Sequence, residues 1–386
     1  MKVLIAGDFC PQNRVAKAYE EGKFSSLYQD LVKVTTGNDY SIVNLECPIV
    51  DDDCTPITKC GPHLKCNATA IEALRFCGFN ACTLANNHFR DYGDKGCLNT
   101  MSLLKQSGID YVGGGESIEE ASKILYKSID GKVLAIINCC ENEFSIAGPL
   151  KAGSNPLNLP SQYKAIVAAR KNSDYVIVIV HGGLEGCQLP SPRMQETYRF
   201  FIEVGADAVV NHHQHCYSGY ELYLGRPIVY GLGNFSFDAS WIASNYRINW
   251  HEGYMVVLNF HDDGTISIRL IPYTQSFENP GTILMEGKDC DNFFRRIIEI
   301  NRIIENPERL FVEYNKYIDT HSDWYRIIFE PWGKGFRSLR RKGWLPSLVS
   351  KQKWLSLADY MICETHHECI KRYFYKLIEQ YEDENE

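Results

Sequence analysis

The stretch LANNHFRDYG, residues 84–93, places polar side chains directly after a short apolar run. Asn86, Asn87 and His88 each carry atoms that can bind a metal ion or a phosphate oxygen. Asparagine is common in the turn that follows a strand, so this stretch alone gives weak support for a site. Its meaning depends on whether other strands of the chain end in the same way.

Short apolar runs that are typical of β-strands recur over the first 275 residues and alternate with helical patterns. They are KVLIA (2–6), YSIVNL (40–45), ACTLA (81–85), YVIVIV (175–180) and ADAVV (206–210). This alternation predicts an α/β fold. Pairs such as ILYKSIDGKVLAIINC (124–139), with its Asp-Gly turn, predict hairpins. The expected sheet structure is therefore mixed rather than purely parallel.

After residue 275 the pattern becomes helical and aromatic. In NFFRRIIEINRIIENPERLFVEY (292–314) the apolar residues recur near a period of 3.6, which predicts a helix. We expect a main domain of residues 1–275 and a helical, aromatic and basic extension of residues 276–386. Tryptophans and basic residues within 324–354 suit contact with a membrane surface. Packing of these tryptophans on the main domain is the alternative that we weigh more heavily.

Composition narrows the class of protein. The 386 residues are 45% hydrophobic, which is enough for a substantial core, and the net charge of −8 argues against a nucleic-acid partner. The apolar run in MKVLIAGDFCPQN is too short for a signal peptide, and no run is long enough for a transmembrane helix. Fifteen irregularly spaced cysteines do not resemble a disulfide framework. We expect a cytoplasmic protein, with peripheral contact at the inner face of the membrane as an extension of that hypothesis.

Potential metal ligands follow all five strand-like runs. They are Asp8, Glu46, Asn87 with His88, His181, and His213 with His215. Because the carboxyl ends of strands in an open α/β sheet face one crevice, these side chains are expected to meet there. Carboxylates clustered with imidazoles need a positive charge between them. The set suits Mn, Fe or Zn, and the absence of ligand-spaced cysteines argues against a thiolate zinc site.

Two divalent metal ions about 3.5 to 4 Å apart would hold both oxygens of a displacement reaction, with Glu46 as the candidate bridge. His213 and His215 point the same way only if the chain between them is extended, which would turn His212 elsewhere. Each residue has a simpler explanation: Asp8 could cap a turn, and His181 could be a buried histidine bonded to backbone. Agreement among five strand ends favours the shared site.

Seven ordered segments resemble the motifs of the bacterial capsule-synthesis protein CapA family, which includes the poly-γ-glutamate synthesis protein PgsA. The segments are GDFCPQNR (7–14), NLECPIV (44–50), LANNHFRDYG (84–93), YVGGGES (111–117), VIVHGGLEG (178–186), GADAVVNHHQH (205–215) and GRPIVYGLGNFSFD (225–238). The resemblance covers about residues 1–240. It implies the calcineurin-like metallophosphoesterase fold, a four-layered α/β/β/α sandwich with a dinuclear metal centre.

The resemblance also implies roles for single residues. Six residues match the family's metal ligands: Asp8, Glu46, Asn87, His181, His213 and His215. His88 matches the histidine that contacts phosphate and can protonate the leaving group, a role that suits imidazole. Two positions depart from the family pattern, because Cys10 replaces a histidine and Glu46 replaces an aspartate. The first departure leaves open whether one or two metals bind.

The residues and the resemblance together predict a metal-dependent, phosphoesterase-like hydrolase that acts in capsule, poly-γ-glutamate or exopolysaccharide biosynthesis. Its substrate would carry a phosphate or a carboxylate. The residues in or beside the motifs that could bind it are Arg14, Asn44, Glu185, Arg193 and Asn234. The alternative is a non-catalytic assembly factor whose C-terminal region contacts other capsule or polysaccharide synthesis proteins, because a fold alone does not establish catalysis.

Overall fold

The computed structural model describes residues 1–50, 54–238, 250–276, 279–329, 336, 338–339, 342, 344–346 and 348–383. The chain divides into two compact units. The first comprises Met1–Ile57 and Gly61–Phe311, and the second comprises Thr58–Cys60 and Val312–Glu386. The two-domain division that we expect near residue 275 stays a prediction.

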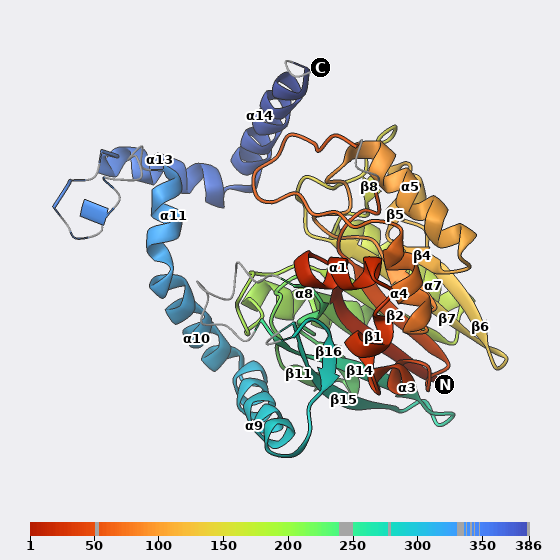
Figure 1. Ribbon diagram of the computed structural model, residues 1–386. Coiled ribbons are helices and arrows are strands. Elements are labelled where there is room, and N and C mark those ends of the chain that lie inside the picture. The colour runs from red at the N-terminus through yellow and green to blue at the C-terminus, as the bar shows by residue number, and fades with distance from the viewer. Residues whose placement is uncertain are drawn as a thin grey trace. The chain divides into compact units, whose positions relative to one another are not determined.

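Eight strands of the first unit form one mixed sheet (Figure 1). Their order is β16 (Thr282–Leu284), β15 (Ile266–Gln275), β14 (Glu252–Phe260), β1 (Lys2–Phe9), β2 (Tyr40–Leu45), β3 (Ala81–Thr83) and β4 (Asp110–Val112), with β13 (Asn234–Ser236) paired to the end of β1. Strands β1 to β4 are parallel to one another, whereas β14 pairs with β1 in the antiparallel sense. The carboxyl ends of β1, β2 and β3 therefore lie at one edge of the sheet.

Six strands form the second sheet. Their order is β11 (Tyr220–Tyr223), β12 (Arg226–Val229), β10 (Ala208–His212), β9 (Tyr175–His181), β7 (Lys132–Cys140) and β6 (Leu125–Ile129). Strands β7, β9 and β10 are parallel, so they too end at a common edge. Strands β6 and β7 form the predicted hairpin, and Asp130 and Gly131 in its turn both have positive φ. A separate short pair consists of β5 (Gly114–Gly115) and β8 (Gly153–Ser154).

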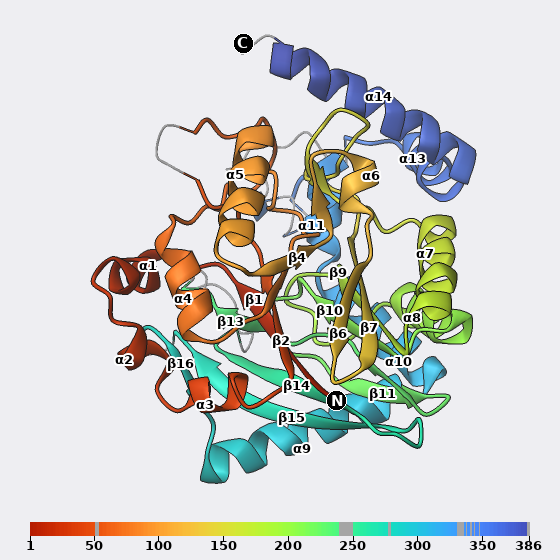
Figure 2. The same ribbon diagram turned by 90° about the vertical axis from the view of Figure 1, so that its right-hand side faces the viewer.

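Helices cover the outer faces of both sheets, as Figure 2 shows for α4 and α5 on one side and α7 and α8 on the other. The helices of the first unit are α1 (Asn13–Glu20), α2 (Phe24–Tyr28), α3 (Leu31–Thr35), α4 (Thr69–Phe76), α5 (Gly93–Gln106), α6 (Ile118–Ala121), α7 (Leu159–Asn172), α8 (Pro192–Val204) and α9 (Gly287–Ile304). The remaining described helices are α10 (Pro307–Thr320), α11 (Ser322–Phe329), α13 (Lys351–Ile362) and α14 (Glu364–Asp383).

Burial along the strands explains the layers. In β1, Val3 and Ile5 belong to the core that also holds the apolar residues of β7, β9 and β10. Leu4 and Ala6 point to the opposite face and belong to a second core with α1, α4 and α5. Residues Val176–Val180 of β9 are all apolar and buried, because they belong to the core between the two sheets and α7 packs against the strand. The predicted α/β/β/α sandwich with a helical C-terminal extension is confirmed.

The second unit contains the last part of α10 and the helices α11, α13 and α14. Among the residues within 324–354 that suggest membrane contact, Trp332, Arg337, Arg340 and Arg341 lie outside the described part of the chain. None of the helices that the structure describes combines the length and the apolar character that a bilayer-spanning helix needs.

Gly7 lets the end of β1 approach β13. The pairing register between β1 and β2 shifts between Ala6 and Asp8, and the Asp8 amide donates to the Gly233 carbonyl at 3.1 Å. A Cβ atom on Gly7 would lie 1.9 Å from the Gly233 carbonyl oxygen, far inside van der Waals contact. The backbone conformation around Asp8 therefore requires a glycine, which has no side chain, at position 7 of this bulge.

We expect Gly7→Ala to lower the free energy of unfolding by roughly 3 kcal/mol or more, because two backbone segments must separate. Gly264→Ala is the matched control, since Gly264 has a φ of +81° but no atom within 4 Å of its added Cβ. The control should cost only about 1 kcal/mol from backbone strain. Urea unfolding of both variants measures the difference, and equal losses would contradict the proposed clash.

Candidate metal centre

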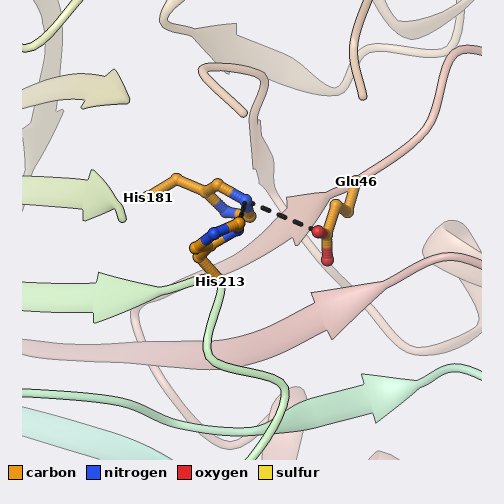
Figure 3. Close-up of side chains that lie close together, drawn as sticks. All are labelled: Glu46, His181 and His213. Carbon is orange, nitrogen blue, oxygen red and sulfur yellow. Dashed lines mark hydrogen bonds and ion pairs between the residues drawn. The ribbon is translucent and has the colours of Figure 1, made fainter. Parts of the chain in front are cut away.

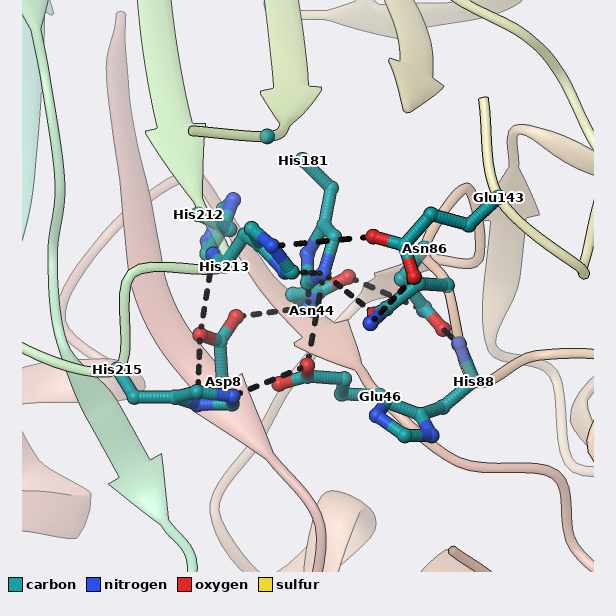
Figure 4. Close-up of polar contacts among 12 residues, drawn as sticks. Asp8, Asn44, Glu46, Asn86, His88, Glu143, His181, His212, His213 and His215 are labelled. Atoms are coloured by element: carbon teal, nitrogen blue, oxygen red, sulfur yellow. Dashed lines mark hydrogen bonds and ion pairs between the residues drawn. The ribbon is translucent and has the colours of Figure 1, made fainter. Parts of the chain in front are cut away.

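The strand ends of the two sheets bring the predicted polar residues together (Figure 4). In the first sheet Asp8 of β1 is paired in register with Asn44 of β2. In the second sheet Cys140, His181 and His212 are aligned across β7, β9 and β10. Residues that follow these positions leave the sheets at the same edge, so side chains distant in sequence share one buried site.

One group of candidate ligands contains Glu46, His181 and His213, whose ligand atoms lie within 4.8 Å of one another. Nε2 of His181 lies 3.4 Å from Oε1 of Glu46 and 3.0 Å from Nδ1 of His213. Figure 3 shows these three side chains converging. The same His181 nitrogen lies 3.0 Å from Oδ1 of Asn87, which adds an amide oxygen to the group.

A second group contains Asp8, Glu46 and His215, also within 4.8 Å of one another. Nε2 of His215 lies 3.6 Å from Oε1 of Glu46, and its Nδ1 lies 3.8 Å from Oδ2 of Asp8. In Figure 4 the Glu46 carboxylate lies between His181 and His215. Glu46 is thus the residue that both groups share.

The electrostatics of the site centre on Glu46. Its side chain is fully buried, and neither carboxylate oxygen has a hydrogen-bond partner. Burial raises the pKa of Glu46 well above the usual carboxyl value, and the nearby Asp8 raises it further. Burial also holds the pKa of His181 well below its usual range, and the surrounding histidines add to this effect. A neutral His181 imidazole beside the Glu46 carboxylate fits a bound cation, since a buried carboxylate without a hydrogen-bond partner is destabilising on its own.

Two asparagines orient the candidate ligands. Nδ2 of Asn44 donates to Oδ1 of Asp8 at 2.7 Å and lies 3.2 Å from Nδ1 of His181. Nδ1 of His215 lies 2.8 Å from Oδ1 of Asn234, which comes from β13. In the second contact Nδ1 of His215 donates to the Asn234 oxygen, which leaves Nε2 of His215 to face a metal. Both asparagines, which the sequence suggests as substrate-binding residues, thus touch candidate ligands directly.

The backbone around the two closing histidines differs from the expectation. His213 has a φ of 93° and His215 a φ of 56°, so the chain is not extended between them. Both rings reach the site because the backbone turns through left-handed conformations that are rare for residues other than glycine. His212 ends β10, and its Nε2 lies 2.9 Å from the Ala6 carbonyl oxygen. It ties the second sheet to β1.

His88 forms a pair with a buried aspartate. Its Nδ1 lies 2.7 Å from Oδ2 of Asp91, and both side chains are buried. The same aspartate oxygen accepts a hydrogen bond from the Leu64 amide at 2.7 Å. Asp91 is absent from the predicted site, although its position three residues after His88 within LANNHFRDYG is a sequence signal. The pair fixes the orientation of the imidazole through its Nδ1.

Glu143 is a further residue at the site that the sequence analysis misses. Its Oε1 lies 3.9 Å from Nε2 of His213, and its Oε2 lies 3.5 Å from Nδ2 of Asn87. Figure 4 shows its carboxylate directed toward His213. Glu143 comes shortly after β7, so it also lies at the edge where the parallel strands end. The sequence predicts this strand only as part of a hairpin. Trp250, which stacks on His215 with ring centroids 4.7 Å apart, has no local signal.

The other predicted residues lie outside the two groups. Arg14 of α1 pairs with Asp238, with Nε 2.9 Å from Oδ2 and Nη2 2.7 Å from Oδ1. Glu185 is exposed in the turn after β9 and contributes to the raised pKa of Glu46. Arg193, in the first turn of α8, forms an ion pair with Glu141.

Cys10, the departure from the family pattern, is buried beside other thiols. Its Sγ lies 3.3 Å from Nε2 of Gln12. Burial raises the pKa of the Cys47 thiol, and the nearby thiols of Cys10 and Cys66 raise it further. Burial raises the pKa of Cys10 above the usual thiol value. The side chain is thus held as a neutral thiol by its surroundings.

Comparison with known proteins places the sequence in a family. The family model described as bacterial capsule synthesis protein PGA_cap matches residues 2–239. Capsule biosynthesis protein CapA of Bacillus anthracis is 28% identical over 280 residues, covering 70% of this chain and 67% of that protein. PGA biosynthesis protein CapA of Bacillus subtilis is 30% identical over 240 residues, covering 61% and 63%. The chain thus spans about two thirds of the length of these relatives.

Solved structures are more distant. A novel phosphatase from Mycoplasma pneumoniae is 13% identical with a TM-score of 0.46, covering 76% of this chain and 98% of that one. The family match, in contrast, extends over more than half of the present sequence and includes all six candidate ligands. The chain therefore belongs to the bacterial capsule synthesis protein PGA_cap family.

Proposed function

We propose that the protein is a metal-dependent hydrolase of phosphoesters that acts in capsule, poly-γ-glutamate or exopolysaccharide biosynthesis. The observation that carries the proposal is the buried Glu46 carboxylate, which lacks hydrogen-bond partners and is shared by two groups of candidate ligands. The names of the two Bacillus relatives, which refer to capsule and PGA biosynthesis, support the pathway.

The residues fit two divalent ions, proposed as Mn, Fe or Zn. Glu46, Asn87, His181 and His213 would hold one ion, and Asp8, Glu46 and His215 the other. Cys10 lies two residues after Asp8, but its raised pKa disfavours the thiolate that a metal would bind, so these three residues are the proposed ligands of the second ion. When bound, such ions would polarise a phosphoryl oxygen and lower the pKa of water.

We assign the proton transfer to His88. Because Asp91 accepts from Nδ1, a protonated His88 ring carries its transferable proton on Nε2. The buried Asp91 carboxylate stabilises the charged ring and keeps its orientation. His88 would thus protonate the leaving oxygen of the ester, while Arg14 and Arg193 are candidates to contact anionic parts of the substrate.

The second candidate function is an assembly factor for capsule or polysaccharide synthesis. The observation that favours it is the exposed run Tyr373, Phe374 and Tyr375 on α14, which follows Lys371 and Arg372. Exposed aromatic side chains next to basic ones suit a protein partner or a membrane surface. A protein that binds metal but hydrolyses neither p-nitrophenyl phosphate nor bis-p-nitrophenyl phosphate would favour the assembly factor over the hydrolase.

The main test is metal content measured together with activity. Protein purified without chelator should carry about two ions of Mn, Fe or Zn per chain and hydrolyse p-nitrophenyl phosphate or bis-p-nitrophenyl phosphate. We expect Asn87→Ala and His213→Ala to lower both metal content and turnover at least about tenfold. Elemental analysis and nitrophenolate release measure the two quantities.

Asn172→Ala and His367→Ala are the matched controls, because both residues are exposed and lie outside the candidate centre. They should leave both quantities unchanged. A wild-type protein without metal above background, or variants that retain full metal, would refute the shared centre.

Glu46→Gln removes the negative charge of this side chain and keeps its shape nearly unchanged. A carboxyl whose folded pKa is raised stabilises the fold at low pH, and this stability is lost as the pH rises through the raised pKa. In chelator-treated protein at pH 8 the variant should therefore be more stable than wild type by roughly 1 to 3 kcal/mol. The difference should shrink at pH 5, and metal should stabilise the variant less than wild type.

Urea unfolding with and without metal measures these effects, and Glu72→Gln on the exposed face of α4 is the control that should change nothing. A Glu46→Gln variant that is less stable than wild type in chelator would show that the carboxylate has a structural partner instead.

The loss of kcat in His88→Ala and Asp91→Asn should depend on the leaving group of the substrate. We expect kcat on phenyl phosphate to fall by roughly 10² to 10⁴ in His88→Ala, because phenolate needs a proton to leave. The loss on p-nitrophenyl phosphate should be much smaller, since nitrophenolate leaves without one. Asp91→Asn should show the same pattern more weakly, with metal content unchanged in both. Equal losses on both substrates would indicate a purely structural role.

A further inference from the structure

An apolar groove of about 550 Å³ lies between α7 and α8. Its apolar lining consists of Leu159, Pro160, Tyr163 and Phe200, and its polar lining of Arg193, Glu196 and Thr197. Leu159 is 46% exposed and Tyr163 is 49% exposed, although both are large apolar side chains. The volume lies within the range of roughly 300 to 1,000 Å³ that is usual for small-molecule sites.

The groove is lined by the first turns of α7 and α8, at the edge of the sheet that carries the candidate metal centre. Both helices begin at that edge, where Asn158 caps α7 and Ser191 caps α8. Leu157, just before α7, donates its amide to the Cys140 carbonyl at the end of β7, at 2.6 Å. Helix α8 likewise begins after the loop that follows His181 of β9. The first turns of both helices therefore lie beside the strand ends.

Named contacts connect the groove to the centre. Arg193 lines the groove and forms an ion pair with Glu141, the residue that directly follows β7. Glu141 also accepts a hydrogen bond from the Gly183 amide, two residues after His181, at 3.2 Å. Glu143 then approaches His213 at 3.9 Å. A ligand that extends from the centre past Glu143 and Arg193 would enter the groove.

We propose that this groove binds the apolar chain of a phosphodiester whose phosphate lies at the candidate metal centre. The proposal rests on the proposed function and names its substrate class. Burial of a hydrocarbon chain against Leu159 and Tyr163 is favourable, while the Arg193 guanidinium stays close to the polar end of the ligand. A polyanionic chain fits this path less well, because it would meet the carboxylates of Glu141 and Glu143.

The test compares two substrates with one leaving group, methyl 4-nitrophenyl phosphate and octyl 4-nitrophenyl phosphate. In both reactions water adds to phosphorus, the bond to the nitrophenyl oxygen breaks and 4-nitrophenolate leaves. For the full-length wild-type chain, kcat/KM should be at least about tenfold higher for the octyl ester, because the longer chain buries more apolar surface.

Tyr163→Asp should bring this ratio close to one. Ala168→Asp, on an exposed position of the same helix outside the groove, should preserve the wild-type ratio. A wild-type ratio near one, or a ratio that Tyr163→Asp leaves unchanged, would overturn the proposal.

A binding measurement separates the groove from the hydrolase. The neutral fluorescent probe N-octyldansylamide should bind the chelator-treated protein, and Tyr163→Asp should weaken its binding at least about tenfold while Ala168→Asp does not. If neither ester is hydrolysed but the probe behaves in this way, the groove is supported and the hydrolase function fails. If both esters are hydrolysed equally and the probe does not bind, the groove is refuted and the hydrolase function stands.

Discussion

The burial of the Glu46 carboxylate is the constraint on which the rest of the site depends. A charged carboxylate without hydrogen bonds is unstable in a protein interior unless a cation or a proton compensates it. The sequence places this residue at the end of β2, where the first sheet meets the histidines of the second. The strands of both sheets must therefore end at the same edge, and the packing of the two hydrophobic cores keeps the sheets in this position. The four-layered packing is the scaffold that keeps these ends in register.

Local backbone conformations direct the candidate ligands into the site that the two sheets form. The bulge at Gly7 turns the end of β1, and the left-handed residues His213 and His215 direct their rings inward. Such conformations persist only where the surrounding structure enforces them. Here the enforcement comes from β13, whose Asn234 holds His215, and from the contact of His212 with Ala6. Strain at the site is thus balanced by rigid packing around it.

The sequence predicts much of this arrangement because parallel strands share a simple rule. Asp8, Glu46 and His181 follow apolar runs, and the edge where such runs end is common to all of them. The rule does not give the conformation of the loop after β10, so the extended path expected between His213 and His215 is wrong. The rule also does not predict the contact between Asn234 and His215, because this contact depends on the pairing of β13 with β1. Long-range pairing of this kind has no local pattern in the sequence.

The chemistry of the site supports the proposed hydrolase more directly than it supports an assembly factor. A surface for protein contacts needs shape and exposed apolar area, which α14 of the second unit supplies with Tyr373 to Tyr375. It does not need a fully buried carboxylate, or a buried aspartate that orients a histidine as Asp91 orients His88. The buried carboxylate is costly for a protein without its ligand, so these features support the proposed reaction at this edge of the two sheets. The acidic residues beside the site then restrict what can approach it, because Glu143 repels anions that no cation compensates.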